Sequence, residues 1–225
     1  MRQQFLVFSL LFSLLAIAPP VRSQPAADEL DISPEILESS PVLQRWRENI
    51  PDLLEEIRRN PSFRTRVRLG YSHFPASDDK AGFNLGVEDV FIGRTGLALG
   101  ADYNGTFGGE VASVGGELRY YALPLGGYLN VAPTVGYRYL QTDDYSRGGL
   151  NVGVRLMLVP SRGGAADIAL SQNFVSPRSG EEVGITTLSF GYAVTPNFRI
   201  STDIQKQNAR ESRDSRVGVV LEWMP

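Results

Sequence analysis

A strict alternation of residue types, running from Ser62 to Trp223, constrains this chain most. In ten successive segments every second residue is apolar or aromatic, and the residues between are small, polar or charged. The segments lie at 63–72, 83–88, 97–103, 114–120, 129–139, 150–158, 166–174, 186–192, 198–205 and 216–223. A period of two indicates β-strands with unlike faces, and the segments have about the length that crosses a bilayer as a tilted strand. The alternation therefore predicts an all-β fold, a ten-stranded antiparallel up-and-down transmembrane β-barrel.

The connections between the segments alternate between long and short. The long ones lie at 74–80, 104–109, 141–147, 175–182 and 207–213, and the short ones at 93–95, 123–126, 160–164 and 194–196. The long loops therefore share one end of the barrel, and the short turns share the other end with both termini. This asymmetry is typical of bacterial outer-membrane barrels, whose long loops lie outside the cell. A soluble lipocalin-like carrier would show the same alternation with its apolar face turned inward.

Aromatic residues gather at both ends of the apolar face and predict two interfacial girdles. The girdle at the short-turn end is expected to contain Phe63, Phe91, Tyr120, Tyr192, Phe198 and Trp223. The girdle at the long-loop end is expected to contain Tyr71, Phe83, Tyr103, Tyr137, Tyr139 and Phe174.

The opposite face carries a set of charges that parity places in the lumen. It contains the arginines Arg64, Arg66, Arg68, Arg119, Arg138, Arg155, Arg199 and Arg216 and the carboxylates Glu88, Asp102, Glu117, Asp167, Asp203 and Glu222. Eight arginines against six carboxylates are nearly balanced, and a barrel of about eight strands is filled by its own side chains. The set predicts a structural salt-bridge core that largely plugs the lumen. The alternative is a narrow conduit with a slight preference for anions.

The residues before the barrel divide into three predicted segments. Residues 1–23 have the positive start, apolar run and small-residue ending of a cleaved signal peptide. Residues 24–32 read as a linker, and residues 33–61 show helical spacing of apolar residues, interrupted by Pro51, which predicts two short periplasmic helices. The apolar stripe of these helices favours a cap over the barrel mouth, or a place on the membrane surface, over a deep plug.

The last strand ends in Leu221-Glu222-Trp223 and resembles the terminal aromatic strand of small, porin-like bacterial outer-membrane barrels, although Met224-Pro225 follow here. The resemblance covers residues 62–223, is architectural and points to no named subfamily. It implies an outer-membrane location, with outer-membrane lipid and the barrel-insertion machinery as partners. A periplasmic partner of the N-terminal helices is a further expectation.

The remaining composition favours a protein that is not an enzyme. The chain has no cysteine, and its net charge of -3 gives no basic excess for nucleic acid. No cofactor or metal site is expected; acidic loop pairs such as Asp143-Asp144 offer at most weak Ca²⁺ binding. The single histidine, His73, with Asp78 or Ser77, is the one candidate for a hydrolase at the barrel rim.

The sequence indicates the function only at the level of broad classes. We expect a structural or narrow solute-passage role, and a surface binding or adhesion barrel acting through its long loops is the alternative. Pro133, inside the fifth segment, predicts a bulge or a local break because proline has no N–H to donate.

Overall fold

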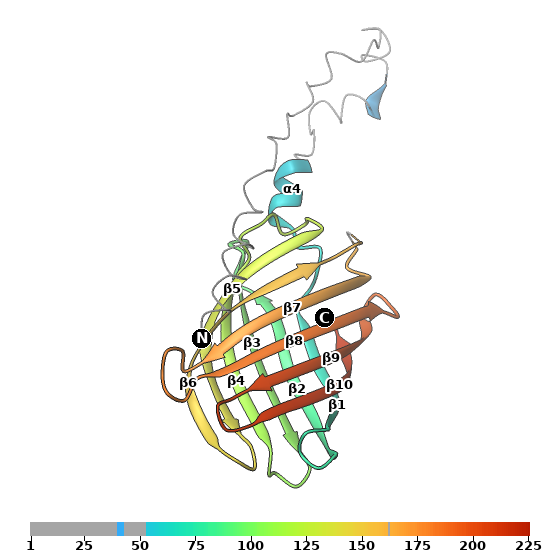
Figure 1. The fold of residues 1–225 in the computed structure, drawn as a ribbon. Coiled ribbons are helices and arrows are strands. Elements are labelled where there is room, and N and C mark those ends of the chain that lie inside the picture. The colour runs from blue at the N-terminus through green and yellow to red at the C-terminus, as the bar shows by residue number, and fades with distance from the viewer. Residues whose placement is uncertain (1–39, 43–52, 162) are drawn as a thin grey trace. The chain divides into compact units, whose positions relative to one another are not determined.

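Ten antiparallel strands form a closed barrel in the described part of the chain (Figure 1). The computed structural model describes residues 40–42, 53–161 and 163–225. The strands are β1 (Arg66–Phe74), β2 (Lys80–Phe91), β3 (Leu97–Thr106), β4 (Ala112–Tyr120), β5 (Leu129–Gln141), β6 (Ser146–Leu158), β7 (Ala166–Val175), β8 (Val183–Ala193), β9 (Phe198–Asn208) and β10 (Arg213–Trp223). The predicted fold class is therefore confirmed. The predicted signal peptide and linker, and most of the predicted helical segment, lie outside the described residues.

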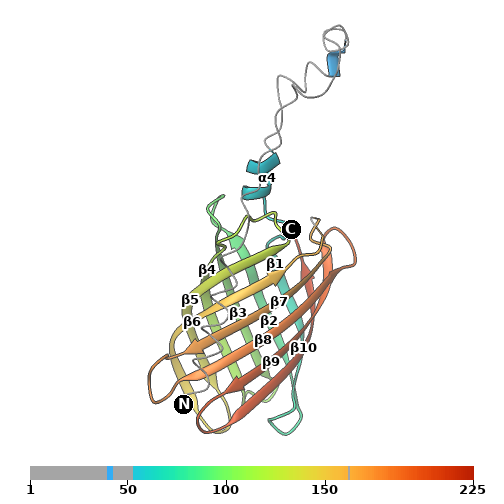
Figure 2. The same ribbon diagram turned by 45° about the horizontal axis from the view of Figure 1, so that its top comes forward.

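Each strand pairs with its neighbours in sequence, and β1 pairs with β10 to close the wall. The closing ladder runs from Val67 opposite Trp223 to His73 opposite Val217. Figure 2 shows the strands inclined across the wall, with helix α4 (Leu53–Arg59) at the end where β1 begins and β10 ends. The turns at this end, called the short-turn end, span four to eight residues between strands, and the loops at the opposite end, called the long-loop end, span four to seven. The predicted contrast in length is therefore wrong, because the strands extend into the predicted long loops. Each of the described strands pairs on both sides, so the wall satisfies nearly all of its own backbone hydrogen bonds, which a structure inside lipid requires.

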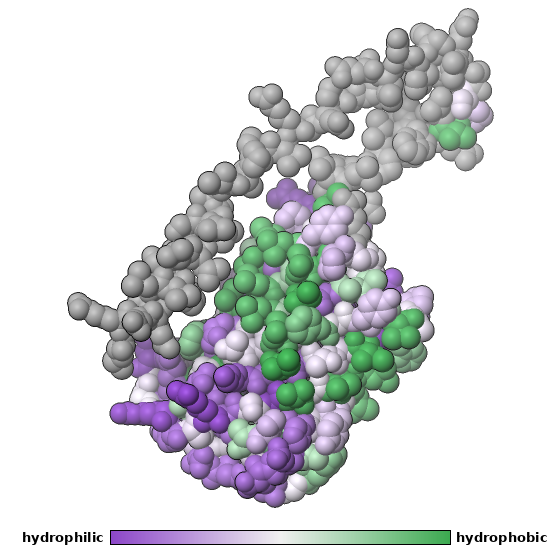
Figure 3. Space-filling model, turned by 45° about the vertical axis from the view of Figure 1, so that its right-hand side comes forward, coloured by the Kyte–Doolittle hydropathy of each residue, from purple (hydrophilic) through white to green (hydrophobic). Residues whose placement is uncertain are grey.

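The alternation gives the wall an apolar outside. Outward side chains along the strands are large and exposed, for example Leu69 at 63%, Tyr137 at 61% and Leu221 at 53% of their surface. Figure 3 shows these hydrophobic residues gathered on the wall and hydrophilic residues gathered toward the lower end of the view. In water this surface would be costly to expose, and in hydrocarbon it is matched to its surroundings.

Pro133 produces the local break that its missing N–H predicts. The ladder between β4 and β5 ends at Arg119 opposite Thr134, the residue after Pro133. One further hydrogen bond follows, from the backbone N–H of Ala122 to the carbonyl of Val131 at 2.9 Å. On its other side Pro133 stays opposite Val154 with no change of register. The proline thus interrupts one ladder only, and the wall continues.

A β-bulge in β2 changes which residues face inward. The register with β3 shifts between Val87 and Val90, and Asp89 has a positive φ of 55°. After the bulge Phe91 lies opposite Ala98, which is fully buried inside the barrel. The prediction that Phe91 belongs to the outer girdle is therefore wrong, because the extra residue inverts the parity that the prediction assumed.

The first predicted segment begins later than its alternation indicates. Strand β1 starts at Arg66, and the preceding residues are not in the ladder. Phe63 turns into the barrel, where it is 2% exposed, and Arg64 is exposed to solvent. The predictions of Phe63 as a girdle residue and Arg64 as a lumen residue are both wrong, because parity holds only within a paired strand.

Helix α4 is joined by its last carbonyls to the turn between β4 and β5. The N–H of Gly126 donates to the carbonyl of Ile57 at 2.7 Å, and the N–H of Leu125 donates to Arg58 at 3.2 Å. A Cβ at Gly126 would lie 2.8 Å from the Ile57 oxygen, so only glycine allows this approach. The helices of the described part of the chain fall short of a bilayer span in length and apolar content.

Candidate functional site

The middle of the barrel lumen holds a balanced set of charged side chains. The bulge brings in Asp89, and the late start of β1 leaves out Arg64. The charges that face inward along the middle of the lumen are Arg66, Arg68, Arg119, Arg138, Arg155, Arg199 and Arg216 together with Glu88, Asp89, Asp102, Glu117, Asp167, Asp203 and Glu222, all in the described part of the chain. Seven arginines thus face seven carboxylates, against the predicted eight and six.

Arg66 lies at the centre of this network. Its guanidinium contacts Asp89 at 2.5 Å, Asp167 at 3.1 Å and Glu88 at 3.2 Å, and the residue is 2% exposed. These carboxylates lie on β2 and β7, so the Arg66 side chain joins β1 to its neighbour and to the opposite part of the wall.

The seam between β1 and β10 is bridged by a second group of ion pairs. Arg68 on β1 reaches Glu222 on β10 at 3.0 Å and Asp203 on β9 at 2.9 Å. Arg199 on β9 contacts the same Glu222 at 2.6 Å and Asp167 on β7 at 2.7 Å. A Cβ at position 191 would overlap the Arg199 guanidinium, so the glycine there leaves room for the arginine.

Asp89 is the carboxylate that parity alone misses. It is fully buried, and besides Arg66 it accepts hydrogen bonds from Arg119 at 3.0 Å and from the Tyr121 hydroxyl at 2.6 Å. Arg119 also pairs with Glu117. The sequence does carry a signal: Glu88 and Asp89 are consecutive, which a strictly alternating strand does not accommodate.

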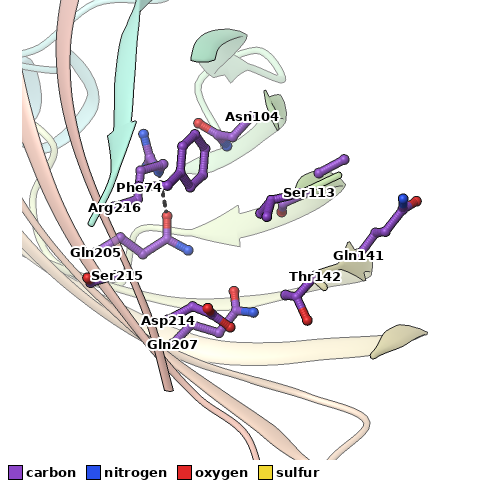
Figure 4. Close-up of a pocket in the computed structure, with 12 residues that line it drawn as sticks. Phe74, Asn104, Ser113, Gln141, Thr142, Gln205, Gln207, Asp214, Ser215 and Arg216 are labelled. Atoms are coloured by element: carbon purple, nitrogen blue, oxygen red, sulfur yellow. Dashed lines mark hydrogen bonds between the residues drawn. The ribbon is translucent and has the colours of Figure 1, made fainter. Parts of the chain in front are cut away.

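The charges nearer the long loops are less densely paired. Arg138 contacts Asp102 at 2.5 Å. Arg216 donates to the Gln205 side chain at 3.0 Å, shown as the dashed line in Figure 4, and its nearest carboxylate, Asp203, is 3.8 Å away.

Two small cavities lie on this side of the network. One of about 80 Å³ lies among the charged side chains, and one of about 30 Å³ opens toward the loops (Figure 4). Arg216 lines both cavities. At roughly 10–15 Å³ per water, the larger has room for about five to eight water molecules and the smaller for about two or three.

An apolar floor lies inside the short-turn end of the barrel. The rings of Phe63, Phe91 and Tyr121 pack together with centroids 4.9–6.0 Å apart. Other members of this cluster are Ala98, Leu125, Ala132, Met157, Val159 and Ala169. The alternation predicts a lumen that is polar throughout, and this apolar floor differs from that prediction. It arises because two residues expected in the outer girdle turn inward.

The other predicted girdle residues lie on outward positions of the strands. At the short-turn end these are Tyr120, Tyr192, Phe198 and Trp223, each 46–65% exposed. At the long-loop end they are Tyr71, Phe83, Tyr103, Tyr137, Tyr139 and Phe174. Phe83 packs on Tyr103 at a centroid distance of 5.4 Å and on Phe107 at 6.0 Å.

His73 faces outward at the loop end of β1. Its Nε2 lies 3.4 Å from Asp79, and both side chains are partly or largely exposed. Neither Ser77 nor Asp78 is among the side chains that contact it in the described part of the chain. The predicted hydrolytic group is therefore not assembled.

Carboxylates in the loops are held by local contacts. A hydrogen bond from Arg147 lowers the pKa of Glu211, and hydrogen bonds from its own backbone N–H and from Thr106 lower the pKa of Glu110. Asp143 of the acidic loop pair contacts Lys80 at 3.1 Å. Across the described residues, no group of three or more potential ligands has metal-site geometry.

The closed antiparallel wall, apolar outside and charged inside, defines a transmembrane β-barrel protein of the outer-membrane class. Proteins of this class reside in the cell outer membrane with their long loops outside.

Three solved structures of outer-membrane proteins match this chain at low similarity. Outer membrane phospholipase A from Escherichia coli has 13% identity and a TM-score of 0.38, over 70% of this chain and 95% of that one. Ail, the attachment invasion locus protein of Yersinia pestis, has 9% identity and a TM-score of 0.31, over 72% and 98%. The Salmonella typhi outer membrane phospholipase dimer with bound calcium has 14% identity and a TM-score of 0.35, over 76% and 96%. Similarity at this level gives no information about the activity of this chain.

No protein-family model matches the sequence, and no curated protein matches it significantly.

Proposed function

We propose that this chain is a sealed outer-membrane barrel that has a structural role and does not conduct solutes. The observation that carries the proposal is the neutralised charge network lying over the apolar floor. A solute that passed through would have to separate buried ion pairs and then cross packed aromatic rings. Both steps are unfavourable, because unpaired buried charges and solvated apolar contacts are each costly.

The charge balance supports a sealed lumen over an anion conduit. The conduit depended on an excess of arginine, and seven arginines against seven carboxylates leave no excess. The barrel is also narrow, since wide aqueous channels take about sixteen strands.

Planar-bilayer recording of the full processed chain tests this function. The expected result is a stable bilayer baseline after insertion, verified by heat-modifiable gel mobility of the same sample. A general porin in the same bilayer provides the positive control. Repeated conductance steps whose ion selectivity changed in Asp102→Asn would refute the sealed lumen, because that carboxylate borders the larger cavity.

The other functions considered fit the barrel less well. A soluble lipocalin-like carrier needs an apolar interior, and here the middle of the interior is charged. An adhesion barrel acting through its long loops remains an alternative, and binding of whole cells or matrix proteins to the purified barrel would favour it. The insertion machinery and a periplasmic partner of the N-terminal helices remain predictions.

A further inference from the structure

A row of polar side chains crosses the outer face of four neighbouring strands near the long-loop end. Gln172 on β7 lies opposite Thr186 on β8, Thr186 opposite Lys206 on β9, and Lys206 opposite Ser215 on β10. The Thr186 hydroxyl donates to the Gln172 side chain at 2.6 Å. The next outward row toward the short turns is apolar and contains Leu170, Leu188, Ile204 and Val217. The polar row therefore marks where the apolar band ends on this side of the barrel.

Two cations lie at this row: Lys206 is part of it, and Arg213 lies one step nearer the loop between β9 and β10. Lys206 and Arg213 are both exposed, and within the described residues neither side chain makes a hydrogen bond or an ion pair. Arg213 is two residues from Ser215, the partner of Lys206, so the two cations are diagonal neighbours on one face. Diagonal neighbours in a sheet are about 7–8 Å apart, which lets two long side chains reach one phosphate.

The carboxylates of the same hairpin do not neutralise these cations. Glu211 contacts Arg147 at 2.6 Å. Asp214 lies on the inward face of β10, where it borders the smaller cavity and accepts from Ser212 at 3.4 Å. The outward face of the hairpin thus keeps its positive charge.

The other loops at the same end have the opposite charge balance. Taken with three strand residues on either side, each of them has more carboxylates than cations, as their charged residues show: Asp78, Asp79 and Lys80; Glu110; Asp143, Asp144 and Arg147; Arg178, Glu181 and Glu182. The hairpin of β9 and β10 is the exception, with Lys206, Arg210 and Arg213 against two carboxylates. One side of the long-loop end is therefore basic and faces lipid, while the remainder is acidic.

We propose that Lys206 and Arg213 bind the phosphate groups of lipids in the membrane leaflet at the long-loop end. Cations directly beyond an apolar band lie at headgroup depth, with their aliphatic stems along the band. A phosphate there accepts charge-assisted hydrogen bonds from both side chains, and the Thr186 hydroxyl adds a polar neighbour. The lipid is a phosphate-bearing one of the surrounding membrane, and the β9–β10 face gives the barrel a preferred lipid side.

Native mass spectrometry of the full processed chain in neutral detergent, titrated with diphosphorylated lipid A, tests this site. The double variant Lys206→Gln/Arg213→Gln is expected to raise the apparent Kd about thirtyfold, because each cation near an anionic headgroup contributes roughly a factor of five. Lys206→Gln alone should raise the apparent Kd about fivefold. This single variant replaces the double variant in the test if the double variant does not give a heat-modifiable barrel. Binding of diacylglycerol, which carries no phosphate, should be weak and equal in all proteins.

A charge-matched control removes two exposed arginines elsewhere. Arg94→Gln/Arg178→Gln alters one short turn and one long loop and is expected to leave the Kd unchanged. An equal loss in both double variants would overturn the proposal in favour of a general electrostatic attraction. An unchanged Kd in Lys206→Gln/Arg213→Gln would overturn it outright. Displacement of lipid A by equimolar inorganic phosphate would reassign the two cations to a soluble anion.

Discussion

Replacing Asp89 with asparagine tests whether the lumen network behaves as a buried core. The substitution keeps the side-chain shape and removes one negative charge that lies 2.5 Å from Arg66 and 3.0 Å from Arg119. At an effective dielectric constant of about 20, two unit charges 3 Å apart attract by roughly 5–6 kcal/mol. Much of that attraction offsets the desolvation of the charges. The expected net loss is therefore about 3–5 kcal/mol, the usual effect of removing one partner from a buried ion pair.

The assay is urea unfolding of the barrel in phospholipid vesicles, followed by heat-modifiable gel mobility and tryptophan fluorescence. Asp79→Asn is the matched control, because that carboxylate is 81% exposed and should change the unfolding free energy by less than about 0.5 kcal/mol. In a double-mutant cycle, Asp89→Asn and Arg119→Gln should couple by about 1–3 kcal/mol. If Asp89→Asn were no less stable than Asp79→Asn, the network would be hydrated and the argument for a sealed core would fail.

Three further results are expected. Gly126→Ala should increase proteolysis before β1, because a Cβ collides with the carbonyls at the end of α4; Gly180→Ala, with open space around it, should not. Arg147→Gln should return the lowered pKa of Glu211 toward its ordinary range, which an NMR titration of the carboxyl group can follow. In the wild type the Arg147–Glu211 contact is present at pH values above the ordinary pKa of glutamate and is lost as the pH falls through the lowered pKa. His73→Ala should leave phospholipid and peptide hydrolysis at the level of protein-free vesicles, since among the described residues the His73 side chain pairs with Asp79 and with no serine. Hydrolysis by the wild type that is lost in this variant would revive a rim hydrolase.

The strands themselves are predictable from the sequence because alternation is a local property. Each of the ten segments overlaps an observed strand, and Pro133 interrupts a ladder where its chemistry requires. The ladder between β1 and β10 confirms closure. The predicted difference in connection length is wrong, because alternation does not mark where a strand ends and the strands extend into the predicted long loops.

The inward and outward positions are predictable only while the register is unbroken. Phe91 was misassigned because the bulge at Asp89 adds one residue, and no count along a single strand detects a change in pairing with its neighbour. Phe63 and Arg64 were misassigned because nothing local marks Arg66 as the first paired residue. The apolar floor was missed for the same reasons, since it assembles from residues distant in sequence that meet only in the closed barrel.

The ion pairs across the seam determine when the barrel can become stable. Arg68 belongs to the first strand, and besides Glu88 on β2 its partners are Asp203 and Glu222 on the last two strands. A growing chain can therefore pair its earliest arginines with β2, but their remaining partners arrive only with its final residues. Contacts between chain ends form late because of their loop-closure entropy. Neutralisation of the lumen is then completed only when the wall closes, so a chain lacking β9 and β10 would leave the wall open and Arg68 with Glu88 as its remaining carboxylate partner.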